Sequence, residues 1–146
     1  MKKLLAIIVA AVMIAACSVT AFADTTTVTY EVQPTYTVAI PASVTLSDAD
    51  VTADITASDV MLENGSQITV TLSAASNTAS GSTFNAKNGD STVNYTITGD
   101  SAISVGDTVA TFTADGSKTL TFSAADKSAT TKSGEHTETL TFTISA

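Results

Sequence analysis

Apolar and polar residues alternate along most of the chain that follows the first two dozen residues. In Ile68-Thr69-Val70-Thr71-Leu72, for example, every second residue is apolar and threonine lies between. A period of two indicates half-buried strands, because successive side chains of a strand point to opposite faces. Threonine is β-branched and polar, so it suits the wet face of an antiparallel sheet. Similar rows occur at Val28–Val32, Tyr36–Ile40, Val93–Ile97, Leu120–Phe122 and Leu140–Ile144.

Turn signals separate these rows. Three dipeptides accept the positive φ of tight hairpins: Asn64-Gly65, Asn88-Gly89 and Asp115-Gly116. The alternation slips by one within Val109–Phe112, which predicts a β-bulge. The stretch Ser47–Asp59 is rich in small and acidic residues, so only short strands are expected there. With no helical periodicity after residue 23, the pattern predicts an all-β protein: an antiparallel, immunoglobulin-like β-sandwich of about eight strands.

The first 23 residues have a different pattern. Lys2 and Lys3 precede an apolar run from Leu4 to Ala16, and Ala21-Phe22-Ala23 is a small-x-small cleavage pattern. This order predicts a helical signal peptide over residues 1–23 and a single domain over 24–146. The alternative is a lipoprotein anchored at Cys17, because Ile14-Ala15-Ala16-Cys17 resembles a lipobox. The predicted location is therefore secreted or cell-surface, with no membrane span after cleavage.

Charge and cysteine content restrict the possible partners. The chain has 14 acidic and 6 basic residues, and two of the basic residues lie in the predicted signal peptide. An acidic surface repels phosphate, so nucleic acid is not an expected partner. The single cysteine, Cys17, also lies in the signal peptide. Packing and sheet hydrogen bonds must therefore hold the exported domain together without a disulfide.

Two stretches are similar to known surface proteins. Tyr36–Leu46 (YTVAIPASVTL) resembles the opening strand pair of small secreted Gram-positive, Clostridia-type surface proteins. Gly134–Ile144 (GEHTETLTFTI) resembles the closing strand of those proteins and of WxL-like and spore-coat-U or pilin-like β-sandwiches. The resemblance implies surface display, adhesion or assembly, and it brings no catalytic residues. The chain has no tryptophan, so a WxL motif itself is absent.

Candidate chemistry is sparse. His136 is the only histidine, and no Gly-x-Ser-x-Gly context accompanies it. We therefore expect a solvent-facing histidine and no catalytic residues, so the protein is predicted not to be an enzyme. Asp48, Asp50 and Asp54 are candidate ligands for calcium, which favours acidic loops outside cells. No other cofactor is expected.

Aromatic residues are predicted to form core rather than a glycan-binding platform. Six of them lie on the apolar side of the alternation: Tyr30, Tyr36, Tyr95, Phe112, Phe122 and Phe142. Phe84 lies in a polar stretch and has no firm assignment.

The strand predicted over Thr25–Val32 is a candidate for assembly. Its apolar row, Val28, Tyr30 and Val32, pairs within its own domain in the simplest fold, or extends a neighbouring copy's sheet by strand addition. The predicted strands carry threonine where lysine would protect a sheet edge. We therefore predict a non-enzymatic secreted or cell-surface protein with a structural or adhesive role, and with self-association through edge strands as an option. Expected partners are other surface proteins, the protein itself, and cell-wall or host glycans. The alternative function is an extracellular module that binds a glycan or calcium.

Overall fold

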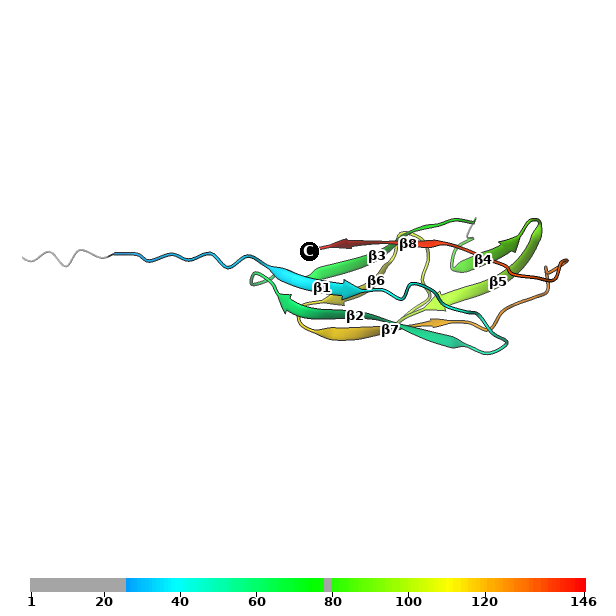
Figure 1. Ribbon diagram of the computed structural model, residues 1–146, viewed down its shortest axis with the longest axis horizontal. Coiled ribbons are helices and arrows are strands. Elements are labelled where there is room, and N and C mark those ends of the chain that lie inside the picture. The colour runs from blue at the N-terminus through cyan, green and yellow to red at the C-terminus, as the bar shows by residue number, and fades with distance from the viewer. Residues whose placement is uncertain (1–25, 78–79) are drawn as a thin grey trace, which may run out of the picture. The chain divides into compact units, whose positions relative to one another are not determined.

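The computed structural model describes residues 26–77 and 80–146 (Figure 1). Contacts divide the chain between Val32 and Gln33, and all the strands of the described residues lie in the second unit, Gln33–Ala146. The strands are β1 (Thr35–Ala39), β2 (Val51–Met61), β3 (Ile68–Ala75), β4 (Thr83–Asn88), β5 (Ser91–Thr98), β6 (Thr108–Phe112), β7 (Gly116–Phe122) and β8 (Leu140–Ser145). The described residues contain no helix, so the all-β prediction is confirmed for this part of the chain.

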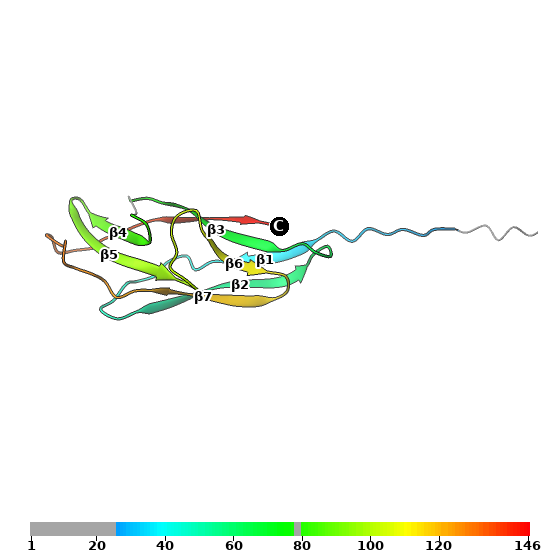
Figure 2. The same cartoon turned by 180° about the vertical axis from the view of Figure 1, so that it is seen from behind.

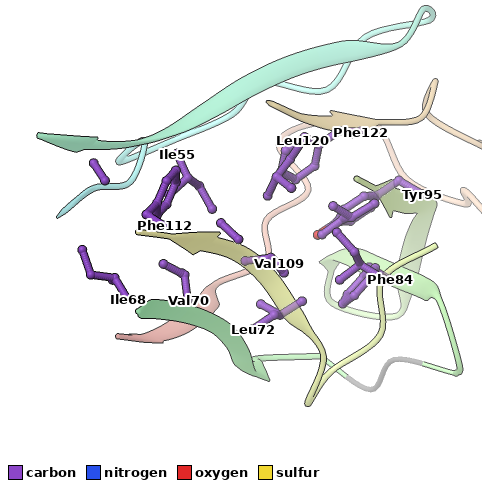
Figure 3. Close-up of a cluster of buried hydrophobic side chains, with 14 of the residues drawn as sticks. Ile55, Ile68, Val70, Leu72, Phe84, Tyr95, Val109, Phe112, Leu120 and Phe122 are labelled. Atoms are coloured by element: carbon purple, nitrogen blue, oxygen red, sulfur yellow. The ribbon is translucent and has the colours of Figure 1, made fainter. Parts of the chain in front are cut away.

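The strands form two antiparallel sheets. One has the order β1-β2-β7-β5-β4 and the other has the order β6-β3-β8. Opposite views show β3 and β8 on one side of the sandwich, with β2 and β7 on the other (Figures 1 and 2). Apolar side chains from both sheets fill the space between them (Figure 3). The fold is therefore sandwich-like, as the alternating pattern predicts.

The centre of the core comes from the inward rows of the central strands. Ile68, Val70 and Leu72 of β3 have no exposed surface. Phe84 of β4 is equally buried, and its ring stacks on Tyr95 with 5.6 Å between the ring centroids. Phe84 is thus a core residue. It faces inward because β4 alternates like its neighbour β5.

The prediction of only short strands within Ser47–Asp59 is wrong. This region begins β2, which at 11 residues is the longest of the described strands. β2 lies between β1 and β7: Val51–Ala57 pair with β7 and Thr56–Met61 pair with β1, so the whole length of the strand is paired. Ile55 and Ala57 are buried, and small residues at the other inward positions still fit a pleated sheet.

The turn predictions are confirmed in part. Gly89, with a φ of 61°, turns the β4–β5 hairpin. Asn64-Gly65 and Asp115-Gly116 instead connect strands that belong to different sheets, so they form no hairpins. The predicted bulge is confirmed, because the pairing shifts between Val70 and Thr71, opposite Val109.

The N-terminal row differs most from its prediction. Thr26–Val32 forms no strand, and the side chain of Tyr30 is 87% exposed. Tyr36 is 38% exposed, so the assignment of Tyr30 and Tyr36 to the core is wrong. The predicted signal peptide, with its helix, Cys17 and the cleavage pattern, lies outside the described residues. Within the described ranges, no helix has the length and hydropathy of a membrane span.

Candidate functional site

One side of the sandwich is less well covered than the rest. Among the described strands, β1 and β8 each lie at the edge of a sheet, and each pairs with one neighbour only. The inward row of β3 is fully buried, whereas Leu140 and Phe142 of β8 are half-buried and Ile144 is 38% exposed. In β1 only Val38 is partly buried. The apolar rows of both edge strands therefore lack part of the cover that the central strands have.

A groove of about 630 Å³ opens on this side. We call it the lateral groove. One chain segment that lines it, Ile40–Leu46, follows β1, and the other, Gly134–Leu140 with Phe142, leads into β8. Between them the groove meets inward side chains of β2, β5 and β7: Ala53, Ile55, Val93, Tyr95, Leu120 and Phe122. The lateral groove is thus an opening between the two sheets with an apolar floor, and its lining also includes Lys127, Glu135 and His136.

Backbone hydrogen bonds fix both lining segments. Lys87 of β4 and Thr137 each donate a backbone N–H to the other's carbonyl, at 3.0 Å. Two residues later, Thr139 accepts a hydrogen bond from the N–H of Ser76 at 2.8 Å. The segment therefore crosses from one sheet to the other here. The opposite segment is held at its end, where Ser47 accepts a hydrogen bond from the N–H of Ala125.

A partly buried polar pair lines the groove. The hydroxyl of Tyr95 donates to Oε2 of Glu138 at 2.6 Å, while Oε1 is enclosed and no donor reaches it with hydrogen-bond geometry. Burial raises the pKa of Glu138. Part of that rise is offset by the Tyr95 hydrogen bond, by the nearby backbone N–H groups of Asn77 and Asn85, and by the charge of Lys87. Burial, and then the Glu138 carboxylate, raise the pKa of Tyr95, so its hydroxyl remains a donor. The pair therefore carries a desolvation cost when Glu138 is ionised.

His136, the one histidine, is anchored to a buried serine. Nε2 of His136 lies 2.8 Å from Oγ of Ser91, and Nδ1 lies 3.0 Å from the carbonyl oxygen of Gly134. A carbonyl only accepts, so the proton is on Nδ1 and Nε2 accepts from the Ser91 hydroxyl. Ser91 Oγ also accepts the backbone N–H groups of Thr131 and Lys132. These hydrogen bonds hold the 131–136 segment against the start of β5. Because Ser91 is fully buried and both lone pairs of its Oγ accept hydrogen bonds, its hydroxyl is not an accessible nucleophile.

The three acidic residues proposed as calcium ligands make separate contacts. Asp48 forms an ion pair with Lys127, Asp50 accepts the N–H of Ala124 at 2.9 Å, and Asp54 accepts the hydroxyl of Thr119 at 2.6 Å. No group of three metal-binding side chains occurs among the residues that the structure describes. Calcium binding at these residues stays a prediction.

Comparison with models of protein families, with curated proteins and with solved structures finds no match for this chain. The lateral groove must therefore be interpreted from its own geometry. The sequence contained one signal for it, the apolar spacing of Ile40, Val44 and Leu46, which are partly buried against the core.

Proposed function

We propose that this chain is an exported, non-enzymatic cell-surface protein, with an immunoglobulin-like sandwich that has a structural or adhesive role and self-associates. The observation that carries the proposal is the incomplete cover of the apolar rows of β1 and β8, next to the lateral groove. Export is supported by the pattern Lys2-Lys3, apolar run and Ala21-Phe22-Ala23.

The exposed edges support association because they lack the usual protection. Natural sheets block edge pairing with lysine, proline or short strands. Neither β8 (LTFTIS) nor β1 (TYTVA) contains a lysine or a proline, and β8, with six residues, is the longer of the two. Additional pairing at these edges would bury apolar surface. Each square ångström of apolar surface removed from water lowers the free energy of association by about 25 cal/mol.

A surface role without catalysis is supported by the hydroxyl groups of Ser91 and Tyr95, which are engaged in hydrogen bonds within the fold. The Ser91 hydroxyl is enclosed, and the Tyr95 hydroxyl is bonded to Glu138. The expected partners are copies of the chain, other surface proteins and envelope or host glycans.

Expression of the full chain in a bacterial host tests this proposal. We expect the exported protein to begin at Asp24 by mass spectrometry, or at a lipid-modified Cys17 if the lipobox is used. Light scattering should then show a mass that rises with concentration.

Substitutions in the edge strand β8 test whether this strand forms the contact between copies. Ile144→Lys places a charge on the inward, exposed end of β8, whereas Thr143→Lys adds the same charge on the opposite face. We expect Ile144→Lys to lower the average mass and Thr143→Lys to leave it close to the parent value. A chain that keeps Met1 inside the cell, or a strict monomer at every concentration, would contradict the proposal.

A further inference from the structure

We propose that the lateral groove of one copy binds Thr26–Val32 of a second copy, which adds to the outer edge of β8 as an extra strand. The inference rests on the self-association proposed above and names its two surfaces. The donor is the N-terminal segment, and the acceptor is the groove.

The donor has the side-chain pattern of an inserted strand. Val28, Tyr30 and Val32 are 90%, 87% and 56% exposed, and they occupy alternate positions. In an extended segment these three side chains point to one face. The intervening Thr29 and Glu31 point to the other face, so the single charge of the segment points away from the apolar floor of the groove.

The lengths of donor and acceptor agree. Val28 and Val32 are four residues apart, about 13 Å in a strand with a rise of about 3.3 Å per residue. Ile40 and Leu46, at the two ends of one lining segment, are six residues apart, or about 20 Å at most by the same measure. The row of three apolar side chains is thus shorter than the longest span that this lining segment can have. Leu140 and Phe142 of β8 line the groove, so a donor in the groove meets the first half of the free edge of β8.

The apolar rows also complement each other. Leu140, Phe142 and Ile144 of β8 are only partly covered, and more than half of each side chain of the donor row is exposed. Strand addition would cover both rows, and backbone hydrogen bonds would fill the free edge of β8. One contact thus accounts for two unusual features of the described chain.

A second copy is the better source of the donor than the same chain. Only Gln33 and Pro34 separate Val32 from β1. A two-residue hairpin there needs a positive φ at Gln33, and a residue that precedes proline prefers an extended conformation. Even a completed hairpin would pair Val28 with Ala39 at the end of β1, whereas the groove lining begins at Ile40.

Each copy has one donor and one acceptor, which are different surfaces. Their contact is therefore heterologous, and repeated contacts produce a head-to-tail chain or a closed ring. The assembly needs no other component, so it can be tested with the exported protein alone.

Matched variants test the donor. Tyr30→Asp puts a charge in the apolar row, and Thr29→Asp puts the same charge on the other face of the segment. Light scattering should show that Tyr30→Asp loses the species larger than a monomer, while Thr29→Asp keeps them. The acceptor is tested with Ala53→Leu, which fills the groove, against Thr52→Leu on the exposed face of β2. Ala42→Trp, at an exposed alanine of the groove lining, is a second block in case Ala53→Leu misfolds.

A mixture of two blocked variants gives the decisive result. The Ala53→Leu or Ala42→Trp copy has an intact donor, and the Tyr30→Asp copy has an intact groove. Each alone should be monomeric, and the mixture should form a species of twice the monomer mass that does not grow further.

Two outcomes overturn the inference, and they differ in what they imply. If the parent chain associates and the blocked variants associate equally well, strand insertion is wrong but self-association stands. If the parent chain is monomeric at every concentration, both proposals are wrong.

Discussion

Thr26–Val32 and β2 show what a strand in this protein requires. The N-terminal segment carries Val28, Tyr30 and Val32 in a regular apolar row, yet it forms no strand and these residues are exposed. β2 has smaller inward residues, including Ala53 and Ala57, yet it extends over 11 residues. The difference is that β2 pairs with β1 on one edge and with β7 on the other. Pairing with a neighbouring strand, more than side-chain hydrophobicity, determines which segment is ordered as a strand.

Truncation of one apolar residue in each region gives the largest expected contrast. Ile55 of β2 is 1% exposed, so Ile55→Ala should lower the free energy of unfolding by about 2–5 kcal/mol. Val28→Ala should change it by no more than about 0.5 kcal/mol in the monomer, because the side chain is 90% exposed. Urea unfolding at a concentration where the protein is monomeric measures both. Similar losses for the two variants would show that Thr26–Val32 packs as firmly as β2.

A smaller loss of stability is expected for Ser91, whose hydrogen-bond partners lie in a loop and not in a strand. Ser91→Ala removes the acceptor for the N–H groups of Thr131 and Lys132 and the donor to His136. Loss of these partners at a buried position should cost about 1–3 kcal/mol. Ser117→Ala, at an exposed position of β7, is the matched control and should be nearly neutral. Equal stability of the two variants in urea unfolding would mean that Ser91 does not fasten the 131–136 segment.

The smallest effect is expected from Glu138→Gln, next to the open side of the sandwich. Burial raises the pKa of Glu138 in the folded chain above its ordinary value of 4.5, so the folded state binds this proton more tightly than the unfolded state. Stability from this group is present below pH 4.5 and is lost as the pH rises through the folded pKa. Glutamine keeps an acceptor for Tyr95 and carries no charge.

Thermal unfolding from pH 4 to pH 8 measures this difference. We expect the Glu138→Gln variant to be more stable than the parent at neutral pH, with an advantage that shrinks as the pH falls through the folded pKa of Glu138 and reaches its minimum below pH 4.5. An advantage that is the same at every pH would rule out ionisation of Glu138 as its source.

Alternation in the sequence predicted most of the sandwich. The rows that contain Val70, Tyr95, Leu120 and Phe142 all form strands, and the slip at Val109 is a bulge. The residues of β2 predicted a strand only weakly, because alanine and aspartate have low strand propensity. Pairing with β7 and β1 overrides that propensity. The sequence could not show whether the turn at Asn64-Gly65 joins two strands of one sheet or strands of different sheets. The dipeptide specifies a turn but not the sheet to which the next strand belongs.

The candidate site was much less predictable. The lateral groove combines residues from Ile40 to Phe142, and its open side follows from β1 and β8 lying at sheet edges. Neither fact can be obtained from local periodicity. The contact between Ser91 and His136 joins residues 45 positions apart, so no short motif indicated it.

Disulfide trapping between two copies tests strand insertion most directly. Cys17 is the only cysteine, so Cys17→Ala leaves a background in which each added thiol is unique. One copy carries Val28→Cys in the donor, and the other carries either Ala53→Cys in the groove or Thr52→Cys on the opposite face of β2. After mild oxidation, non-reducing electrophoresis should show mixed dimers with Ala53→Cys and few with Thr52→Cys. Equal yields from the two positions, or no mixed dimer from Ala53→Cys while the parent chain associates, would contradict insertion of Thr26–Val32 into the lateral groove.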